Sequence, residues 1–373
     1  MAKKGIKEKE TSGNTEESKR NLEQTKSYFK FEGIVEGINK DHAFKTGEIQ
    51  SGKMKGKSYN SVRFQIKTSE TNKLNVELFG CEQDFVYPYK KGEKGKSGDT
   101  MKLKFSKRNE LPKGYNIIGV NVQLEEDESG KLIRKSMVDF DAAEYIYQEL
   151  ENGTSVRVTG EIQKNSYEKN GERYESIKYI IKSIKKIDDI DFEDKNFKEI
   201  NSFSQEIVFV DSDYEEEAIY INAYTIQYGN KFSNLQLVIR PNGNDKIKKF
   251  ANKLTKKLKF GDFIELYGHC LNTVEIVRVD PNDDIDDDDD EDFEGERPDG
   301  LEDTFSNYIV ELRVTGAKKG TFKQEVYEES DFVVDDLIEE SDEDDEEDDD
   351  DFLNDEDEDD DDFFLDDEDD DEL

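Results

Sequence analysis

Hydrophobic and polar residues alternate strictly in several segments of the chain, and this pattern predicts half-buried antiparallel strands. The first such segments are residues 28–35, 61–67 and 73–80, and two more follow at 155–162 and 174–184. The last two are joined by Lys-Asn-Gly-Glu, which predicts a hairpin because Asn-Gly tolerates the positive φ of a type I′ turn.

One amphipathic helix is expected between these two groups of strands, over residues 139–150. Its acids lie in the first turn, where the helix dipole favours them. Phe140, Ala143, Tyr147 and Leu150 form one apolar stripe, and Asn152-Gly153 ends the helix. Three strands, a helix and two strands are the order of a five-stranded Greek-key barrel, the OB-fold.

A second unit repeats this order. Strands are expected at 218–228 and 231–239, and a lysine-rich helix at 245–259. A strand pair at 262–269 and 273–279, and a last strand at 307–314, complete the unit. We therefore predict a mainly β chain with a few helices, built as two OB-like Greek-key barrels with insertions.

The predicted domain organisation follows from shifts in composition. Segments without apolar periodicity or with runs of like charge are expected to be linkers or disordered. The divisions are a disordered N-terminal arm (1–26), a first OB-like domain (27–187) with an insertion (81–137), a linker (188–205), a second OB-like domain (206–330) with an acidic loop (280–303), and a disordered acidic tail (331–373).

The net charge of −41 is distributed very unevenly. Residues 280–303 hold fifteen acids and one base, and residues 331–373 hold thirty acids and no base, so the remainder of the chain carries +3. The total charge alone would argue against a nucleic-acid partner. A slightly basic body that carries two acidic runs remains compatible with a nucleic-acid partner.

Several classes of protein are disfavoured. No segment approaches the ~20 apolar residues of a membrane span, and no signal peptide is evident, so we expect a cytoplasmic protein without membrane contact. Cys81 and Cys270 form no CxxC motif, and two histidines are too few for a His-based metal site. Both Gly-Lys-Ser sequences lack the earlier glycine of a P-loop. We expect no cofactor, no metal site and no enzymatic activity.

The strongest functional signal lies in residues 51–108, which hold fourteen Lys and Arg residues and six acids, interleaved with aromatics. Lysines neutralise a nucleic-acid backbone, and aromatic rings stack on bases whatever their sequence. The candidate nucleic-acid-binding residues here are Lys53, Lys55, Lys57, Tyr59, Arg63, Lys67, Tyr87, Tyr89, Lys90 and Lys91. Phe64, Phe79 and Phe105 alternate within strands, so we expect them in the core.

The second unit offers three further candidates. Tyr220, Tyr224 and Tyr228 share a face of the strand at 218–228, and we interpret them as a stacking platform, with packing as the alternative. The lysines of the 245–259 helix are expected to form an ordinary solvated face.

The acidic tail contains hydrophobic residues that interrupt the carboxylates: Phe352, Phe363, Phe364 and Leu365. An OB-like body followed by such a tail resembles the single-stranded DNA-binding proteins of bacteria and their phages. The resemblance implies that the tail recruits replication or recombination proteins. This chain ends Asp371-Glu372-Leu373 rather than in Pro-Phe, and has two units instead of one. A large-phage version is therefore the closer likeness, which would place the protein in the cytoplasm of a bacterial host.

Three hypotheses remain open. The first is sequence-tolerant binding and protection of single-stranded DNA in phage replication or recombination, with the acidic tail competing for the DNA groove. The alternative is an acidic interaction protein, either a DNA mimic or a chaperone for basic proteins. A third is an OB-containing nuclease or replication enzyme. The sequence specifies no oligomeric state.

Overall fold

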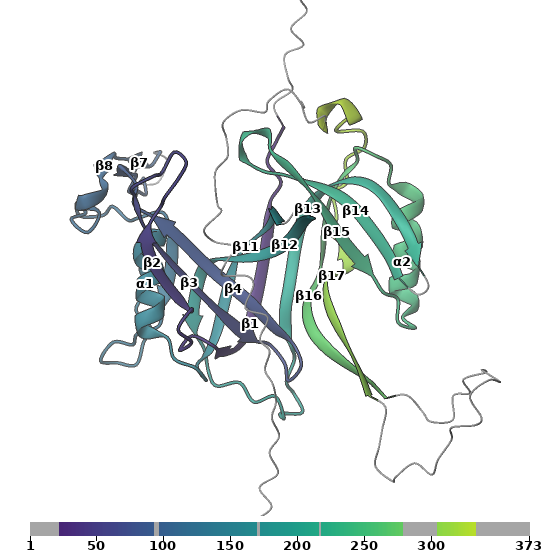
Figure 1. Ribbon diagram of the computed structural model, residues 1–373, viewed down its shortest axis with the longest axis horizontal. Coiled ribbons are helices and arrows are strands. Elements are labelled where there is room, and N and C mark those ends of the chain that lie inside the picture. Colours follow the sequence, from purple (N-terminus) through teal and green to yellow (C-terminus); the bar gives the residue numbers. More distant parts are fainter. Residues whose placement is uncertain (1–21, 93–96, 170–171, 216–217, 279–303, 333–373) are drawn as a thin grey trace, which may run out of the picture.

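The computed structural model describes residues 22–92, 97–169, 172–215, 218–278 and 304–332. Within these ranges the chain is mainly β, with two α-helices and a sheet of thirteen strands that runs through the whole body (Figure 1). No helix in the described ranges has the length and apolar character needed to cross a membrane.

Five strands close the first barrel. They are β1 (Ser27–Glu36), β3 (Ser58–Lys67), β4 (Lys73–Cys81), β11 (Ser155–Lys169) and β12 (Glu172–Lys186). β1, β3 and β4 pair antiparallel in succession, β4 pairs parallel with β12, and β12 returns through β11 to β1. This is the OB-fold order, in which the parallel pair closes the barrel.

The helix α1 (Asp139–Glu149) covers one end of this barrel. Its Ala142, Ala143 and Ile146 are buried against β3 and β4. The helix approaches β4 so closely that a Cβ on Gly80 would lie 2.1 Å from the backbone nitrogen of Phe140, so a glycine is required there.

Short elements surround the first barrel. The edge strand β2 (Phe44–Glu48) pairs with β3. The insertion forms two small sheets, β5–β8 and β6–β7, and a ribbon, β9–β10, that joins β12. Its elements are β5 (Phe85–Val86), β6 (Tyr89–Lys90), β7 (Asp99–Thr100), β8 (Leu103–Lys104), η1 (Phe105–Lys107), β9 (Val120–Gln123) and β10 (Lys135–Met137).

The second barrel repeats the order of the first. Its strands are β13 (Ile200–Glu215), β14 (Ala218–Ile226), β15 (Phe232–Ile239), β16 (Phe263–Arg278) and β17 (Thr304–Ala317). β13, β14 and β15 pair in succession, β15 pairs parallel with β17, and β17 returns through β16 to β13. The helix α2 (Asp245–Lys257) lies between β15 and β16 in sequence. The prediction of two OB-like barrels is confirmed.

Three details of the second unit differ from the sequence prediction. β13 begins at Ile200, inside the predicted linker 188–205. Its buried positions include Asn201 and Gln205, so two amides interrupt the apolar alternation and hide the strand in the sequence. β16 is one continuous strand where a strand pair was expected. The predicted strand 218–228 ends at Ile226.

The structure also shortens the two terminal segments that were predicted to be disordered, residues 1–26 and 331–373. Leu22 is buried on the second barrel and Thr25 exchanges hydrogen bonds with Ile226, so residues 22–26 do not belong to a disordered arm. Asp331 and Phe332 form the end of η4 (Glu329–Phe332), and Phe332 is buried. The acidic tail is therefore residues 333–373 from here on. It lies outside the described residues, as do residues 1–21 and 279–303.

The two barrels are joined through their first strands. β1 pairs antiparallel with β13 from Ser27 opposite Gln205 to Glu32 opposite Ile200, while its other edge pairs with β11. One hydrophobic core consequently runs through both barrels. At their junction, the Tyr179 ring packs edge-on against Phe29 and Phe31, and the buried Cys270 thiol of the second barrel lies beside its hydroxyl.

Buried amides complete this junction. The Asn72 side chain donates to Glu199 Oε1 at 2.8 Å and to the Cys270 carbonyl at 3.2 Å, and it accepts from the Asn272 amide at 2.8 Å. Asn72 belongs to the turn between β3 and β4, and Cys270 and Asn272 to β16. These bonds therefore cross between the barrels.

A second amide extends the same network. Asn201 donates to Glu199 Oε1 and to the Cys270 carbonyl, both at 3.1 Å, and its side-chain oxygen lies 2.6 Å from His269 Nδ1. Thr68 Oγ1 also donates to Glu199 Oε1, at 2.6 Å. One carboxylate oxygen thus accepts three hydrogen bonds at the junction.

We expect Asn72→Ala to lower the free energy of unfolding by about 1–3 kcal/mol, because the buried Asn72 side chain is removed and the Asn272 backbone N–H loses its acceptor. Urea denaturation measures this change. Asn75→Ala is the matched control, since Asn75 lies on the outer face of the adjoining strand, and its change should stay within about 0.5 kcal/mol. Equal losses in the two variants would contradict a role for the network.

Candidate nucleic-acid interface

The outer face of β3 carries three of the predicted residues in one row. Asn60, Val62, Phe64 and Ile66 point into the barrel, so Tyr59, Arg63 and Lys67 point outward from the alternate positions. At ~3.3 Å per residue, Tyr59 and Lys67 lie about 26 Å apart along the strand. The strand therefore offers an extended surface with an aromatic ring at one end, Arg63 at the middle and Lys67 at the other end.

Tyr59 is paired with a second ring. Its centroid lies 5.5 Å from that of Phe79 on β4, with 28° between the ring planes, and 39% of Phe79 is exposed. Phe79 was predicted in the core, and that prediction is wrong. Leu78 and Gly80 are the inward residues of β4, which directs Phe79 to solvent. Phe64 and Phe105 are buried as expected.

A glycine on β2 makes room for this pair. Gly47 lies opposite Tyr59, and a Cβ on Gly47 would be 3.1 Å from the Tyr59 ring. The ring of Tyr59 therefore lies between the flat backbone of β2 on one side and Phe79 on the other. Sequence reasoning missed Gly47, although an isolated glycine in a strand indicates a close approach.

The basic loop before β3 is closed by its own backbone. Ile49 and Lys57 are joined by a hydrogen bond of 2.9 Å, and Gly56 donates to the Ile49 carbonyl at 2.8 Å. Lys53 and Lys55 are exposed at the tip of this loop. The short loop therefore presents these two lysines at the end of the barrel where β3 begins.

Lys57 is held differently. Its ammonium lies 2.6 Å from Asp84 Oδ1 in the insertion. The hydrogen bond raises the pKa of Lys57 and lowers the pKa of Asp84. Lys57 thus connects the loop to the insertion and has one carboxylate partner already, which reduces its value as a phosphate contact.

The insertion places further rings and lysines together. Tyr87 is 56% exposed. Tyr89 exchanges backbone hydrogen bonds with Asn116, and neighbouring Lys90 lies over the Tyr115 ring at 5.9 Å. Lys91 is exposed. A pair that the sequence analysis missed, Lys102 over Phe85 at 3.8 Å, has the same composition.

Arg63 and Lys67 lie farther along β3. Arg63 lies opposite Glu77 in the β3–β4 register. Lys67 is 3.9 Å from Glu36 and 5.6 Å from the centre of the Phe192 ring. Both cations are therefore on the outer face but next to groups of the protein itself.

The three tyrosines of the second unit are not brought together. Tyr220 is half-buried on the outer face of β14. The Tyr224 ring stacks on Phe332, with centroids 4.6 Å apart and 27° between the planes. Tyr228 lies beyond β14 in the turn η2 (Tyr228–Asn230) and is 87% exposed. The structure provides no continuous platform of these three rings.

The outer face of the second barrel also differs in charge. Asn222 on β14 donates to Asp211 at 2.6 Å and to Asp213 at 2.9 Å, both on β13. Carboxylates thus occupy the second barrel where the first carries lysines and rings. The outer face of β3 and β4 is consequently a better candidate for contact with single-stranded nucleic acid than the outer face of β13 and β14.

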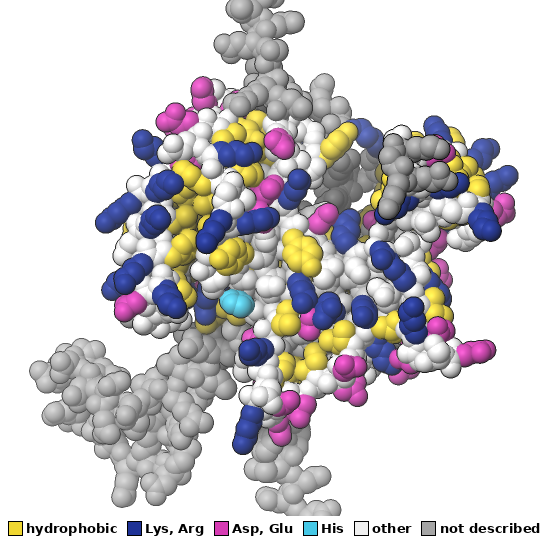
Figure 2. Space-filling model, turned by 180° about the vertical axis from the view of Figure 1, so that it is seen from behind, with side chains coloured by type: hydrophobic (Ala, Val, Ile, Leu, Met, Phe, Trp, Pro, Cys, Tyr) yellow, Lys and Arg dark blue, Asp and Glu magenta, His cyan; other side chains and the backbone are white. Residues whose placement is uncertain are grey.

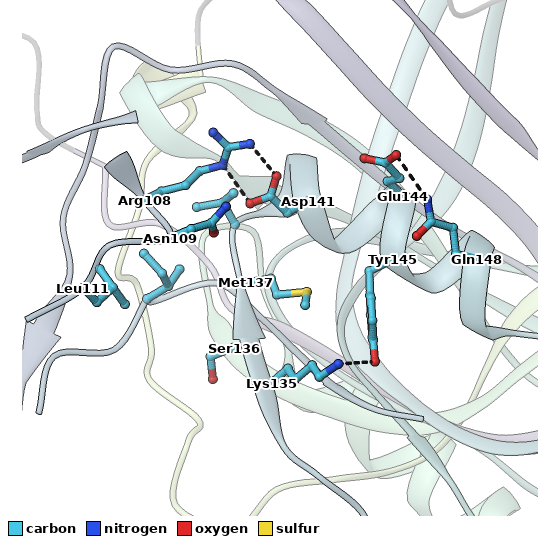
Figure 3. Close-up of a pocket in the computed structure, with 12 residues that line it drawn as sticks. Arg108, Asn109, Leu111, Lys135, Ser136, Met137, Asp141, Glu144, Tyr145 and Gln148 are labelled. Atoms are coloured by element: carbon cyan, nitrogen blue, oxygen red, sulfur yellow. Dashed lines mark hydrogen bonds and ion pairs between the residues drawn. The ribbon is translucent and has the colours of Figure 1, made fainter. Parts of the chain in front are cut away.

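A hollow lies between α1 and the insertion (Figure 3). Arg108 donates to both oxygens of Asp141, each at 2.7 Å, and Lys135 lies 2.8 Å from both Glu125 and Tyr145. The hydrogen bond to Asp141 raises the pKa of Arg108. These charged groups are paired with one another, and the pairs connect the insertion to α1.

The predicted tail residues Phe352, Phe363, Phe364 and Leu365 lie outside the described residues.

The comparisons with known proteins add the following. A family model described as YorF matches residues 29–349. No curated protein matches the chain. Two solved structures of the single-stranded DNA binding protein from Thermus aquaticus are similar at a TM-score of 0.33. The wild type is 11% identical and covers 67% of this chain and 87% of its own, and a deletion mutant is 10% identical and covers 67% and 88%. Our description of both barrels rests on their strand pairings alone and does not depend on this similarity.

The two cysteines should react very differently. Cys270 is completely buried, which raises its pKa to about 12, whereas Cys81 is half-buried opposite Tyr59. Thiol reactivity requires the exposed thiolate. We therefore expect a maleimide to label Cys81 in the folded protein and Cys270 only in urea, as measured by the masses of the labelled peptides. Labelling of Cys270 at the rate of Cys81 in native buffer would contradict the shared core.

Proposed function

The chain belongs to the YorF family, and we propose that it binds single-stranded DNA, without regard to sequence, along β3 and β4 of the first barrel. The observation that carries the proposal is the solvent-facing stack of Tyr59 on Phe79 beside the lysine-bearing loop. Unpaired bases can stack on such rings, whereas the bases of a duplex are already stacked. The proposed activity is binding and protection, without catalysis.

The role of each group follows from its position. Phe79 is the more exposed ring and offers its face to a base, while Tyr59 holds Phe79 in place from beneath. Lys53 and Lys55 on the loop contact the phosphates entering this end of the strand. Lys90, Lys91 and Tyr87 on the insertion extend the same surface. Lys57 positions the insertion through Asp84.

The wider role that we propose is protection of single strands during phage DNA replication or recombination. Carboxylates of the acidic tail compete with DNA phosphates for the basic surface, because a tethered segment has a high effective concentration. Its Phe352, Phe363, Phe364 and Leu365 recruit replication or recombination proteins. The charge partition of the chain supports this proposal: a basic body and a tail with no base.

Phe79→Ala should weaken binding to single-stranded DNA by about five- to a hundredfold, since one stacked base is worth ~1–3 kcal/mol. Fluorescence anisotropy with labelled oligonucleotides measures the change. Tyr214→Ala is the matched control, because Tyr214 is 62% exposed on the second barrel among acids, and it should leave the affinity unchanged. Equal binding of single-stranded and duplex DNA by the unaltered chain would contradict the proposal.

A chain truncated after Phe332 should bind single-stranded DNA more tightly than the full chain, and its affinity should respond less to divalent salt. The cut must follow Phe332, because removing this buried ring would also disturb Tyr224. The same anisotropy titration, with and without magnesium, measures both effects. An unchanged affinity would exclude competition by the tail. Capture of basic protein by the full chain, together with no DNA binding by either form, would favour the alternative of an acidic interaction protein.

A further inference from the structure

Helix α2 of the second barrel is exceptionally basic. Residues 245–259 contain seven lysines and one acid. The six lysines within α2 are all exposed: Lys246, Lys248, Lys249, Lys253, Lys256 and Lys257. We call these six the lysine face. Figure 2 shows Lys and Arg side chains gathered on this side of the molecule, at the left of the view.

No carboxylate in the described ranges neutralises the positive charge of the lysine face. Lys257 lies over the Phe322 ring at 4.0 Å, and none of the six lysines is within ion-pair distance of a described carboxylate. Lys253 follows Lys249 and precedes Lys257 by four residues, and like charges at this spacing destabilise a helix. An anionic occupant would relieve this repulsion.

The chain itself supplies a polyanion at one end of this helix. Phe260 lies three residues after the end of α2, and its ring centroid is 6.4 Å from that of Phe332, the last described residue. The acidic tail therefore begins next to the C-terminal end of α2. Its 41 residues carry no base, and residues 342–351 are ten consecutive acids.

The lengths also match. α2 has 13 residues and is about 20 Å long. The nine residues 333–341 span up to about 30 Å, and the ten acids up to about 35 Å. The acidic run can therefore return along the whole helix. Attachment at one end keeps its effective concentration near the helix high.

We propose that the lysine face of α2 is the docking surface of the acidic tail, with residues 342–351 lying along it. This goes beyond the proposed function, because α2 belongs to the second barrel and docking needs no DNA. The later acids and the hydrophobic residues Phe363, Phe364 and Leu365 remain beyond the docked run. α2 thus anchors the first part of the tail and leaves its far end available.

The experiment is zero-length carbodiimide cross-linking of the full chain at low ionic strength, followed by mass spectrometry. This reagent joins only carboxylates and ammonium groups that are in contact. We expect tail peptides to be joined to lysines of α2 about tenfold more often than to Lys104, Lys107, Lys113 and Lys131, which are exposed on the insertion of the first barrel. Added salt should abolish this preference, because it screens exposed charges.

A variant provides the second measurement. Lys→Gln at 246, 249, 253 and 256 removes four charges and keeps residues of similar helix propensity. It leaves Lys257 on Phe322. We expect cross-links between the tail and the remaining α2 lysines to fall about tenfold, the combined effect of four weak surface pairs. The same exchange at Lys104, Lys107, Lys113 and Lys131, which are exposed and are not among the proposed DNA contacts, is the matched control and should leave these cross-links unchanged.

Three results would overturn the proposal. Tail cross-links spread evenly over all exposed lysines would show that the tail has no fixed dock. Cross-links from residues 280–303 in place of the tail would assign the lysine face to the other acidic run. A loss of DNA affinity when the four α2 substitutions are made in the chain truncated after Phe332, together with unchanged tail cross-links when they are made in the full chain, would make the lysine face a nucleic-acid surface. If urea denaturation shows that the variant has a lower free energy of unfolding than the unaltered chain, the salt dependence of cross-linking in the unaltered chain decides between docking and no docking.

Discussion

The pairing of β1 with β13 is the contact on which the rest of the structure depends. It joins the first strands of both barrels edge to edge, so the two hydrophobic cores become one. Strand pairing leaves amides of both barrels buried at the junction, and each must find a partner there. Glu199 and the Cys270 carbonyl satisfy Asn72 and Asn201 together. The outer faces of the barrels are consequently held in a fixed relation.

This fixed relation separates two kinds of surface. The first barrel presents aromatic rings beside lysines, from β3, β4 and the insertion, which suits the two needs of an unpaired nucleic-acid strand. The second barrel presents carboxylates on β13 and concentrates its positive charge on α2. The same fold thus appears twice with different surface chemistry. Duplication of the barrel alone does not duplicate the candidate site.

Charge within the chain is arranged so that its parts can interact with one another. The body is slightly basic, and nearly all excess acid lies in residues 280–303 and in the acidic tail. Since the described chain ends beside α2, the nearest large positive surface for the tail belongs to the second barrel. The outer face of β3 and β4 on the first barrel is within reach of the far end of the tail, because 41 extended residues span up to about 140 Å. The net charge of the chain therefore describes its two acidic runs and not the surface of its body.

The sequence by itself determined the approximate positions of nine strands and of both α-helices, because period-two and helical patterns are local. The order of these elements was enough to predict two OB-like barrels. It also indicated that lysines and rings gather in residues 51–108. Only the tertiary structure decided how they are used. β13 was hidden because Asn201 and Gln205 are buried, which only partners from other strands permit. Phe79 faces solvent through the register of β4. The ring of Tyr224 is covered by Phe332, and Lys57 is bound by Asp84. Each of these outcomes depends on residues distant in sequence, which no local pattern contains.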